Sequence, residues 1–131
     1  MTDSKKPRDA GRFAYEGLER ALHEKARLGM MTSLMAHPEG LLFGDLKELC
    51  TLTDGNLNRH LKVLQEEGLV EIWKGTVGHR SQTLCRMTRE GRKRFMEYIE
   101  ALEAVIADAA AAAKAARSPS NDRSLKGFSL A

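Results

Sequence analysis

The stretch LTDGNLNRHLKVLQEEGLVEIWKG, residues 52–75, decides the fold that this sequence predicts. When residues 54–67 are projected as a helix at about 100° per residue, one narrow side is apolar. That side carries Leu57, Leu61 and Leu64. The opposite side carries Gly55, Asn58, Arg59, Lys62 and, near the end, Glu66. The pattern predicts a helix that packs its leucines onto a core and presents a polar side to the exterior.

Local signals mark both ends of this helix. Thr53 is suited to the N-cap position, because its side-chain oxygen can accept a hydrogen bond from a free backbone N–H. Gly68 is suited to the left-handed position that follows a last turn. Thr88 stands in the same way before the last helix. His60 lies beside the leucine stripe, where we expect it to pack with one hydrogen bond.

A β-hairpin is predicted directly after the helix. Residues 70–74 alternate as a strand, residues 75–81 are typical of a mobile glycine-containing tip, and residues 82–87 suit the returning strand. Trp73 alternates out of phase with the apolar residues of its strand. It either covers the seam between the hairpin and the helix, which we favour, or stands exposed near a phosphate.

The rest of the chain supplies the other elements. A helical pattern of leucines and methionines spans residues 13–36, and Pro38 ends it. Residues 41–43 predict a single β-bridge, and residues 45–50 a short helix. A long last helix follows the hairpin and runs to residue 116. The order helix, bridge, helix, helix, strand, strand, helix predicts a winged helix-turn-helix, a mainly α fold with a small β-wing.

The totals of the sequence fit one domain with tails. The chain has 131 residues and a net charge of +3. No run of about 18 apolar residues suggests a membrane span, and the charged start does not resemble a secretory signal. Cys50 and Cys85 lack paired spacing, which favours a reducing cytoplasm over a disulfide scaffold. Residues 72–94 are basic, with Glu90 as their single acid, which suits either a polyanion or a solvated face.

The polar side of the helix has a chemistry suited to DNA. Asparagine and arginine can make bidentate contacts with adenine and guanine edges in the major groove. Lys62 can neutralise a phosphate, and Gly55 allows a close backbone approach. A solvated helix face is the alternative, which composition alone favours. The position of the helix before a basic hairpin, which carries Lys74, His79 and Arg80, favours a nucleic-acid interface instead.

Residues 23–106 resemble the compact winged-helix transcriptional regulators of bacteria and archaea related to the MarR and ArsR families. FGDLKELCTLTDGNLNRHLKVLQEEGLVEI, residues 43–72, is similar to their second and third helices and first wing strand. LCRMTREGRKRFMEYIEAL, residues 84–102, is similar to their closing strand and last helix. The resemblance implies a cytoplasmic homodimer that binds operator DNA. The DNA-contacting residues predicted from the resemblance and the residue chemistry are Thr53, Gly55, Asn56, Asn58, Arg59, Lys62, Lys74, His79 and Arg80.

The sequence departs from the metal-sensing branch of these families. Those relatives carry a paired C-V-C where this chain has Cys50 followed by Thr51 and Leu52. A lone thiolate is a poor metal site, since such sites usually need three or four ligands. The histidines show no ligand spacing either, so we assign no metal and no cofactor. Both cysteines lie in apolar patterns, where small core residues are favoured over redox switches.

The last helix predicts a dimer. Its apolar residues recur at spacings of three and four beyond the length that a small core can cover. An exposed apolar stripe of this length implies a partner, and the simplest partner is a second copy of the chain. Burial within the domain is the alternative for the first of these residues, Phe95 and Ile99. The predicted dimer-interface residues are Leu18, Leu22, Ile99, Leu102, Val105 and Ile106.

These features predict a sequence-specific DNA-binding transcriptional regulator, most simply a repressor, that acts as a homodimer on a pseudo-palindromic operator. The predicted boundaries are 1–12 for a disordered basic tail, 13–116 for the DNA-binding and dimerisation domain, and 117–131 for a second disordered tail. The alternative function is a winged-helix protein–protein interaction module without DNA binding, although the polar stripe lacks apolar anchors. No enzyme motif is visible. An unidentified small-molecule effector is kept open as a further partner.

Overall fold

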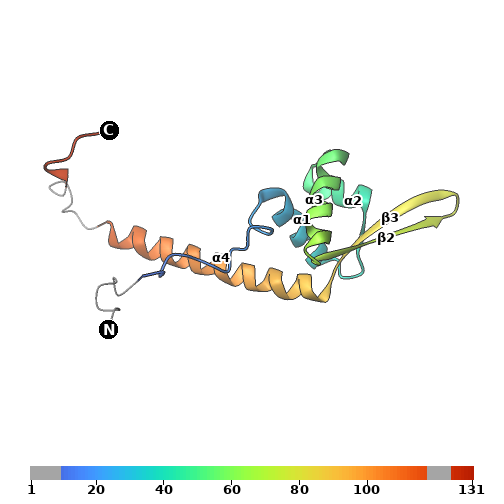
Figure 1. The fold of residues 1–131 in the computed structure, drawn as a ribbon, viewed down its shortest axis with the longest axis horizontal. Coiled ribbons are helices and arrows are strands. Elements are labelled where there is room, and N and C mark those ends of the chain that lie inside the picture. The colour runs from blue at the N-terminus through green and yellow to red at the C-terminus, as the bar shows by residue number, and fades with distance from the viewer. Residues whose placement is uncertain (1–9, 118–124) are drawn as a thin grey trace.

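A computed structural model describes residues 10–117 and 125–131 of the chain. Over these residues the chain forms α1 (Lys25–Ala36), β1 (Leu41–Leu42), α2 (Phe43–Cys50), α3 (Asp54–Glu66), β2 (Val70–Val77), β3 (Arg80–Met87) and α4 (Arg89–Ala115). Figure 1 shows α1 to α3 gathered into one body, from which the β2–β3 hairpin and α4 extend in opposite directions. The predicted winged-helix order is confirmed. The tail residues 1–9 and 118–124, predicted to be disordered, lie outside the described residues.

Both predicted caps of α3 are confirmed. The Thr53 side chain accepts a hydrogen bond from the Asn56 backbone N–H at 3.2 Å. At the other end Gly68 has a φ of +76°, a conformation that costs glycine no side-chain clash. The Leu69 N–H then donates to the Leu64 carbonyl at 2.9 Å, which satisfies one of the acceptors left free at a helix end. These local bonds fix where α3 starts and stops.

The three strands form one antiparallel sheet in the order β1-β3-β2. Leu41 of the short β1 pairs with Cys85 of β3, so the predicted bridge is confirmed. The hairpin is longer than predicted, because β2 continues to Val77 and β3 begins at Arg80. The predicted tip over residues 75–81 is therefore wrong. A two-residue turn with Gly78 at positive φ in its first position matches the twist of the strands, so the ladder runs to the end.

The prediction of a helix over residues 13–36 is wrong in its first half. Helix α1 begins only at Lys25, and residues 10–24 form successive turns that run beside α4 (Figure 1). Tyr15 has a φ of +49°, and a Cβ built on Gly17 would lie 2.9 Å from the Ala101 Cβ. Close docking on α4 therefore overrides the helical pattern of this segment. The Glu24 carboxylate caps α1 by accepting from the Arg27 N–H at 2.8 Å.

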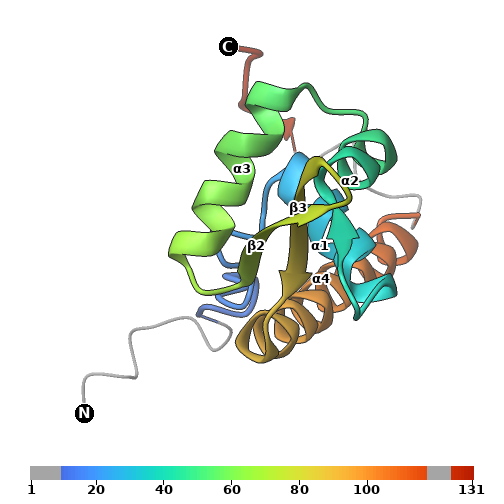
Figure 2. The ribbon, with the colours of Figure 1, turned by 90° about the vertical axis from the view of Figure 1, so that its right-hand side faces the viewer.

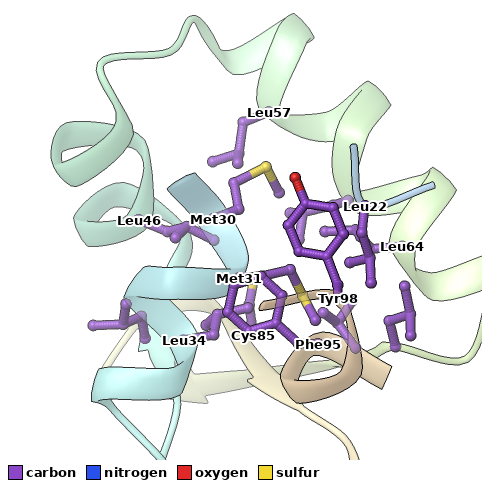
Figure 3. Packing of buried hydrophobic residues seen from close by; sticks show 14 residues of the cluster. Leu22, Met30, Met31, Leu34, Leu46, Leu57, Leu64, Cys85, Phe95 and Tyr98 are labelled. Carbon is purple, nitrogen blue, oxygen red and sulfur yellow. The ribbon is translucent and has the colours of Figure 1, made fainter. Parts of the chain in front are cut away.

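The hydrophobic core lies where α1, α3, the sheet and the first turns of α4 meet. Figure 3 shows Met30 and Met31 of α1 with Leu57 and Leu64 of α3, and the Tyr98 ring of α4 lies among them. The leucine stripe of α3 is buried as predicted, with exposed fractions of 0–2%. Full burial of one such side chain contributes about 1.5–3 kcal/mol. This core holds the inner side of α3 and leaves its outer side free.

Candidate nucleic-acid interface

The outer side of α3 presents amide and basic side chains to solvent. Asn56, Asn58, Arg59 and Lys62 are all exposed. A Cβ built on Gly55 would meet nothing within 4 Å, so the first turn of α3 is open to a close approach. The Asn56 Oδ1 accepts a hydrogen bond from the Arg59 guanidinium at 3.3 Å, which holds the two side chains together. The structure thus places the predicted α3 residues on one accessible surface, beside the hairpin in Figure 2.

The start of α3 is tied to α2. The Lys47 ammonium lies 2.8 Å from the Asp54 carboxylate, across the turn between the two helices. Thr53 is exposed, but its oxygen already caps α3. Thr53 and Asp54 therefore fix the entry of α3, and an acid in the first turn also suits the positive end of the helix dipole.

A groove of about 820 Å³ separates α3 from the hairpin. Its floor is apolar, and its rim carries amides and two lysines, Lys62 of α3 and Lys74 of β2. The residues that line it are Phe43, Asn58, Leu61, Lys62, Gln65, Ile72, Lys74 and Thr83. No carboxylate is among these eight residues. The groove is thus electropositive and suits an anionic backbone.

The tip of the hairpin is a separate part of the interface. His79 and Arg80 are both exposed there, next to the turn at Gly78. Figure 1 shows the tip far from the body of the domain. The predicted DNA-contacting residues thus divide among the α3 surface, the groove and the hairpin tip.

His60 anchors α3 from its buried side. Its exposed fraction is 4%, and an Arg27 guanidinium nitrogen lies 3.1 Å from its Nδ1. A guanidinium can only donate, so Nδ1 is the acceptor and is unprotonated. Glu24 lies 3.8 Å from the same atom, too far for a direct hydrogen bond. Burial lowers the pKa of His60, which agrees with a neutral ring. The expected packing role with one hydrogen bond is confirmed.

The favoured prediction that Trp73 covers the seam between the hairpin and α3 is wrong. Its exposed fraction is 54%, and the Arg86 guanidinium lies 5.8 Å from its ring centroid. Arg86 also forms an ion pair with Glu71 at 2.6 Å. Strand alternation places Glu71 and Trp73 together on the outer face of the sheet, because the inward positions of β2 belong to Val70 and Ile72.

Part of the basic run at residues 72–94 is neutralised within the chain. Arg86 pairs with Glu71, and Arg94 pairs with Glu19 and Glu67. The sequence shows the basic residues but not these partners, since Glu19 and Glu67 are distant from Arg94 along the chain. The net charge of a segment therefore overstates the positive charge that it can offer a polyanion.

The structure distributes the predicted dimer-interface residues between core and surface. Leu22 has an exposed fraction of 0%. It thus has no surface to offer a partner in this conformation. Leu18, Ile99 and Leu102 are half-buried against the core, and Val105 is half-buried as well. Ile106 is 62% exposed on the part of α4 that extends beyond the body. Met96, nearer the start of α4, is 46% exposed, so Ile106 is the more exposed of these two large apolar side chains of the helix.

The two cysteines differ in burial. Cys85 is fully buried in the central strand, and burial raises its pKa to about 11, so its predicted core role is confirmed. Cys50 is half-buried, with its Sγ 3.7 Å from the Ser33 hydroxyl. Within residues 10–117 and 125–131, no three His, Cys, Asp or Glu side chains gather as a metal site. No helix in that same part of the chain is long and apolar enough to span a membrane.

The arrangement of α3 beside the β2–β3 hairpin is that of a known family of proteins. Residues 26–106 match the family described as winged helix DNA-binding domain, and the chain belongs to this family. A segment of 56 residues is 47% identical to the uncharacterized protein MJ0432 of Methanocaldococcus jannaschii. That match covers 43% of this chain and 61% of the relative, so the chain spans less than two thirds of the relative's length.

Three solved structures share the fold. A transcriptional regulator homologue from Pyrococcus horikoshii OT3 is 28% identical with a TM-score of 0.67, covering 74% of this chain and 96% of its own. A MarR family transcriptional regulator from Silicibacter pomeroyi DSS is 24% identical with a TM-score of 0.54, over 81% of this chain and 74% of its own. NadR in complex with 4-hydroxyphenylacetate is 25% identical with a TM-score of 0.55, over 73% of this chain and 67% of its own. The chain is therefore a member of a winged-helix DNA-binding family and shares the fold of these transcriptional regulators.

Proposed function

We propose that this chain is a repressor that binds a pseudo-palindromic operator as a homodimer and blocks transcription by occupancy. The observation that carries the proposal is the exposed amide and basic surface of α3 beside a groove without carboxylates. A winged-helix protein–protein module would instead be expected to expose apolar anchors on this surface. The outer residues of α3, namely Gly55, Asn56, Asn58, Arg59 and Lys62, include none.

Each part of the interface has a role in this proposal. Helix α3 enters the major groove, where Asn58 and Arg59 contact base edges. Lys62 and Lys74 line the groove between α3 and the hairpin, where they bind phosphates of one DNA strand. His79 and Arg80 at the hairpin tip reach the adjacent minor groove, whose negative potential attracts basic side chains.

The dimer is proposed to form through α4. Ile106 is largely exposed, and the helix continues for nine residues beyond it, to Ala115. Alanines in this last part allow two helices to approach closely. Val105 and Leu102, both half-buried, flank the same region. Two copies related by a two-fold axis would present two α3 helices to half-sites about one helical turn apart. Residues 13–116 are proposed as the unit that binds DNA and dimerises.

Regulation by a small molecule extends the proposal. The NadR neighbour was solved with 4-hydroxyphenylacetate, so a small aromatic acid is the first probe to use. A ligand that favours one arrangement of the dimer would shift DNA affinity by its differential affinity for the two arrangements. Operator titrations with and without 4-hydroxyphenylacetate test this extension, which fails if the probe changes neither DNA affinity nor melting temperature.

The experiment that tests the function is selection of bound sequences from a pool of random duplexes at two salt concentrations. We expect enrichment of an inverted repeat and an affinity that falls steeply with salt, because each phosphate contact releases counterions. Binding without an enriched motif would contradict a sequence-specific repressor and indicate an architectural role. Absence of binding would favour the protein-interaction module.

A further inference from the structure

The segment that follows α3 is bound directly to the start of α4. The Thr88 N–H donates to the Leu69 carbonyl at 3.1 Å, and the Thr88 hydroxyl donates to the Gly68 carbonyl at 2.6 Å. The same hydroxyl accepts from the Gly91 N–H at 2.8 Å as the N-cap of α4. One side chain thus joins the end of one helix to the beginning of another.

Gly91 brings the two backbones into contact. A Cβ built on Gly91 would lie 2.0 Å from the Leu69 carbonyl oxygen, a distance at which the two backbones would have to separate. Gly91 is buried, so solvent offers no room for such a shift. The first turn of α4 therefore lies directly against the backbone that leaves α3.

Arg94 completes the contact with an ion-pair cluster. Its guanidinium donates to the Glu67 carbonyl at 2.9 Å and to the Glu67 carboxylate at 2.8 Å. It also donates to both Glu19 carboxylate oxygens, with Nε distances of 3.1 and 3.2 Å. These bonds, first those with Glu19 and then those with Glu67, raise the pKa of Arg94.

The Arg94 cluster supplies a positive charge at the C-terminal end of α3, which has none of its own. The last turn of α3 holds no basic residue, and Glu66 and Glu67 stand there instead. Negative charge at a helix C-terminus is unfavourable, because the free carbonyls already carry partial negative charge. The cation comes from α4, and Arg94 also satisfies one of these carbonyls. The orientation of α3 is therefore coupled to α4 by charge as well as by packing.

The turns at residues 10–24 also take part in the contact between α3 and α4. Glu19 belongs to this segment, and further along it Arg12 and Tyr15 both bind the Asp108 carboxylate, at 2.8 and 2.7 Å. The segment is thus fixed to α4 at Arg94 and again at Asp108.

We infer that Thr88, Gly91 and Arg94 form a joint that fixes the angle between α3 and α4 and so sets the half-site spacing that the dimer accepts. The inference rests on the proposed function, in which two chains meet through α4 and each presents one α3 to DNA. The angle at the joint then determines the distance between the two α3 helices. One base pair rises only about 3.4 Å along the duplex, so a small change of angle favours a different spacing. Arg94 is a positioning residue, since its guanidinium is bonded to Glu19 and Glu67 within the chain.

The test uses the full-length chain and a duplex library in which the selected half-sites are separated by spacers of varied length. Arg94→Met removes the cluster and keeps the aliphatic stem. Arg94→Lys keeps the charge, but an ammonium cannot bridge both carboxylates and the carbonyl as the planar fork does. Glu67→Gln removes one carboxylate and leaves the carbonyl bond. Lys93→Met is the matched control, because it removes one exposed positive charge from the same turn of α4.

We expect Arg94→Met to select the same half-site sequence as the unaltered chain while its preference for the best spacing falls about tenfold, within the usual range of coupling between sites. Arg94→Lys and Glu67→Gln should shift the spacing profile in the same direction by less. Lys93→Met should keep the original profile. A purely structural role would lower the melting temperature and leave the spacing profile unaltered.

The outcomes separate the two proposals. If the unaltered chain selects no inverted repeat, the proposed function fails. If it selects one, and Arg94→Met folds, dimerises and keeps the original spacing profile, the inference about the joint is wrong. If Arg94→Met does not fold, Arg94→Lys and Glu67→Gln decide, and unaltered spacing profiles in both would overturn the inference.

Discussion

The Arg27 guanidinium donates a hydrogen bond to Nδ1 of His60 at 3.1 Å, and this bond joins α1 to the buried side of α3. The bond requires a neutral imidazole, because a protonated ring has no acceptor to offer. Burial is the largest cause that lowers the pKa of His60, and the charges of Arg59 and Arg27 lower it further, against the opposing effect of Glu24. The hydrogen bond that holds the buried side of α3 to α1 is therefore expected to depend on pH.

We expect the free energy of unfolding to decrease as the pH falls below about 6.5, the ordinary pKa of histidine. The unfolded chain then binds a proton that the folded ring resists, so stability is fully present above that pH and is lost below it. Urea unfolding at pH 7.5 and pH 5.5 measures the effect. His60→Asn, which supplies an acceptor oxygen that does not titrate, should flatten this pH dependence. An equal slope in both proteins would contradict the prediction.

Asp108 is expected to hold the turns at residues 10–24 against α4. The bond from Arg12, and after it the bond from Tyr15, lowers the pKa of Asp108 to about 2. Its contribution is therefore present above the ordinary aspartate pKa and is lost as the pH falls toward 2. Asp108→Asn should speed amide hydrogen exchange in this segment and leave exchange in α3 unaltered. Unaltered exchange throughout the segment would show that Gly17 and Glu19 suffice to hold it.

Arg59→Ala and Lys62→Ala are expected to weaken operator binding while the melting temperature stays nearly unchanged, because both side chains are exposed. Loss of an arginine contact to a base costs about 1–3 kcal/mol and relaxes specificity at that position. Loss of a phosphate contact by Lys62 should reduce the salt slope by about 1. Lys114→Ala, at the far end of α4, is the charge-matched control. If a variant that combines both changes kept its full affinity for the operator, α3 would not be the element that reads DNA.

Ile106→Glu is expected to give a monomer in light scattering, because it places a charge in the apolar surface that α4 is proposed to pair. The side chain is 62% exposed within one chain, so the fold itself should survive the change. A chain that ends at Glu100 should be monomeric as well. Glu103→Gln, on an exposed part of the same helix, serves as the control. A dimer that persists in Ile106→Glu would locate the interface elsewhere.

The sequence predicts α3 well because its signals are local. Thr53 and Gly68 act within one turn of the helix ends, and the leucine spacing defines one buried side whatever the helix packs against. The winged-helix order follows from the same kind of signal. The placement of Asn58, Arg59 and Lys62 on the outer side then follows from helix geometry alone.

Long-range contacts account for what the sequence does not predict. Residues 10–24 carry a helical pattern, yet Gly17 and Tyr15 dock on α4, which is about 90 positions away along the chain. Leu22 was predicted at the dimer interface from its helical spacing, but it is fully buried in the hydrophobic core of the chain. The Arg94 cluster joins residues that nothing in their local patterns connects.

The two-residue turn at Gly78 and His79 has a consequence for how such a wing can diverge. Adding one residue to either strand would reverse the face of every side chain beyond it, since successive residues of a strand point to opposite sides. Lengthening that keeps the two strands paired must therefore add one residue to each strand, and two such pairs are needed before the side chains beyond them return to their original faces. Related chains should thus differ in wing reach by discrete steps of about 6.7 Å along the strand, and insertions of odd length should be found only together with a bulge.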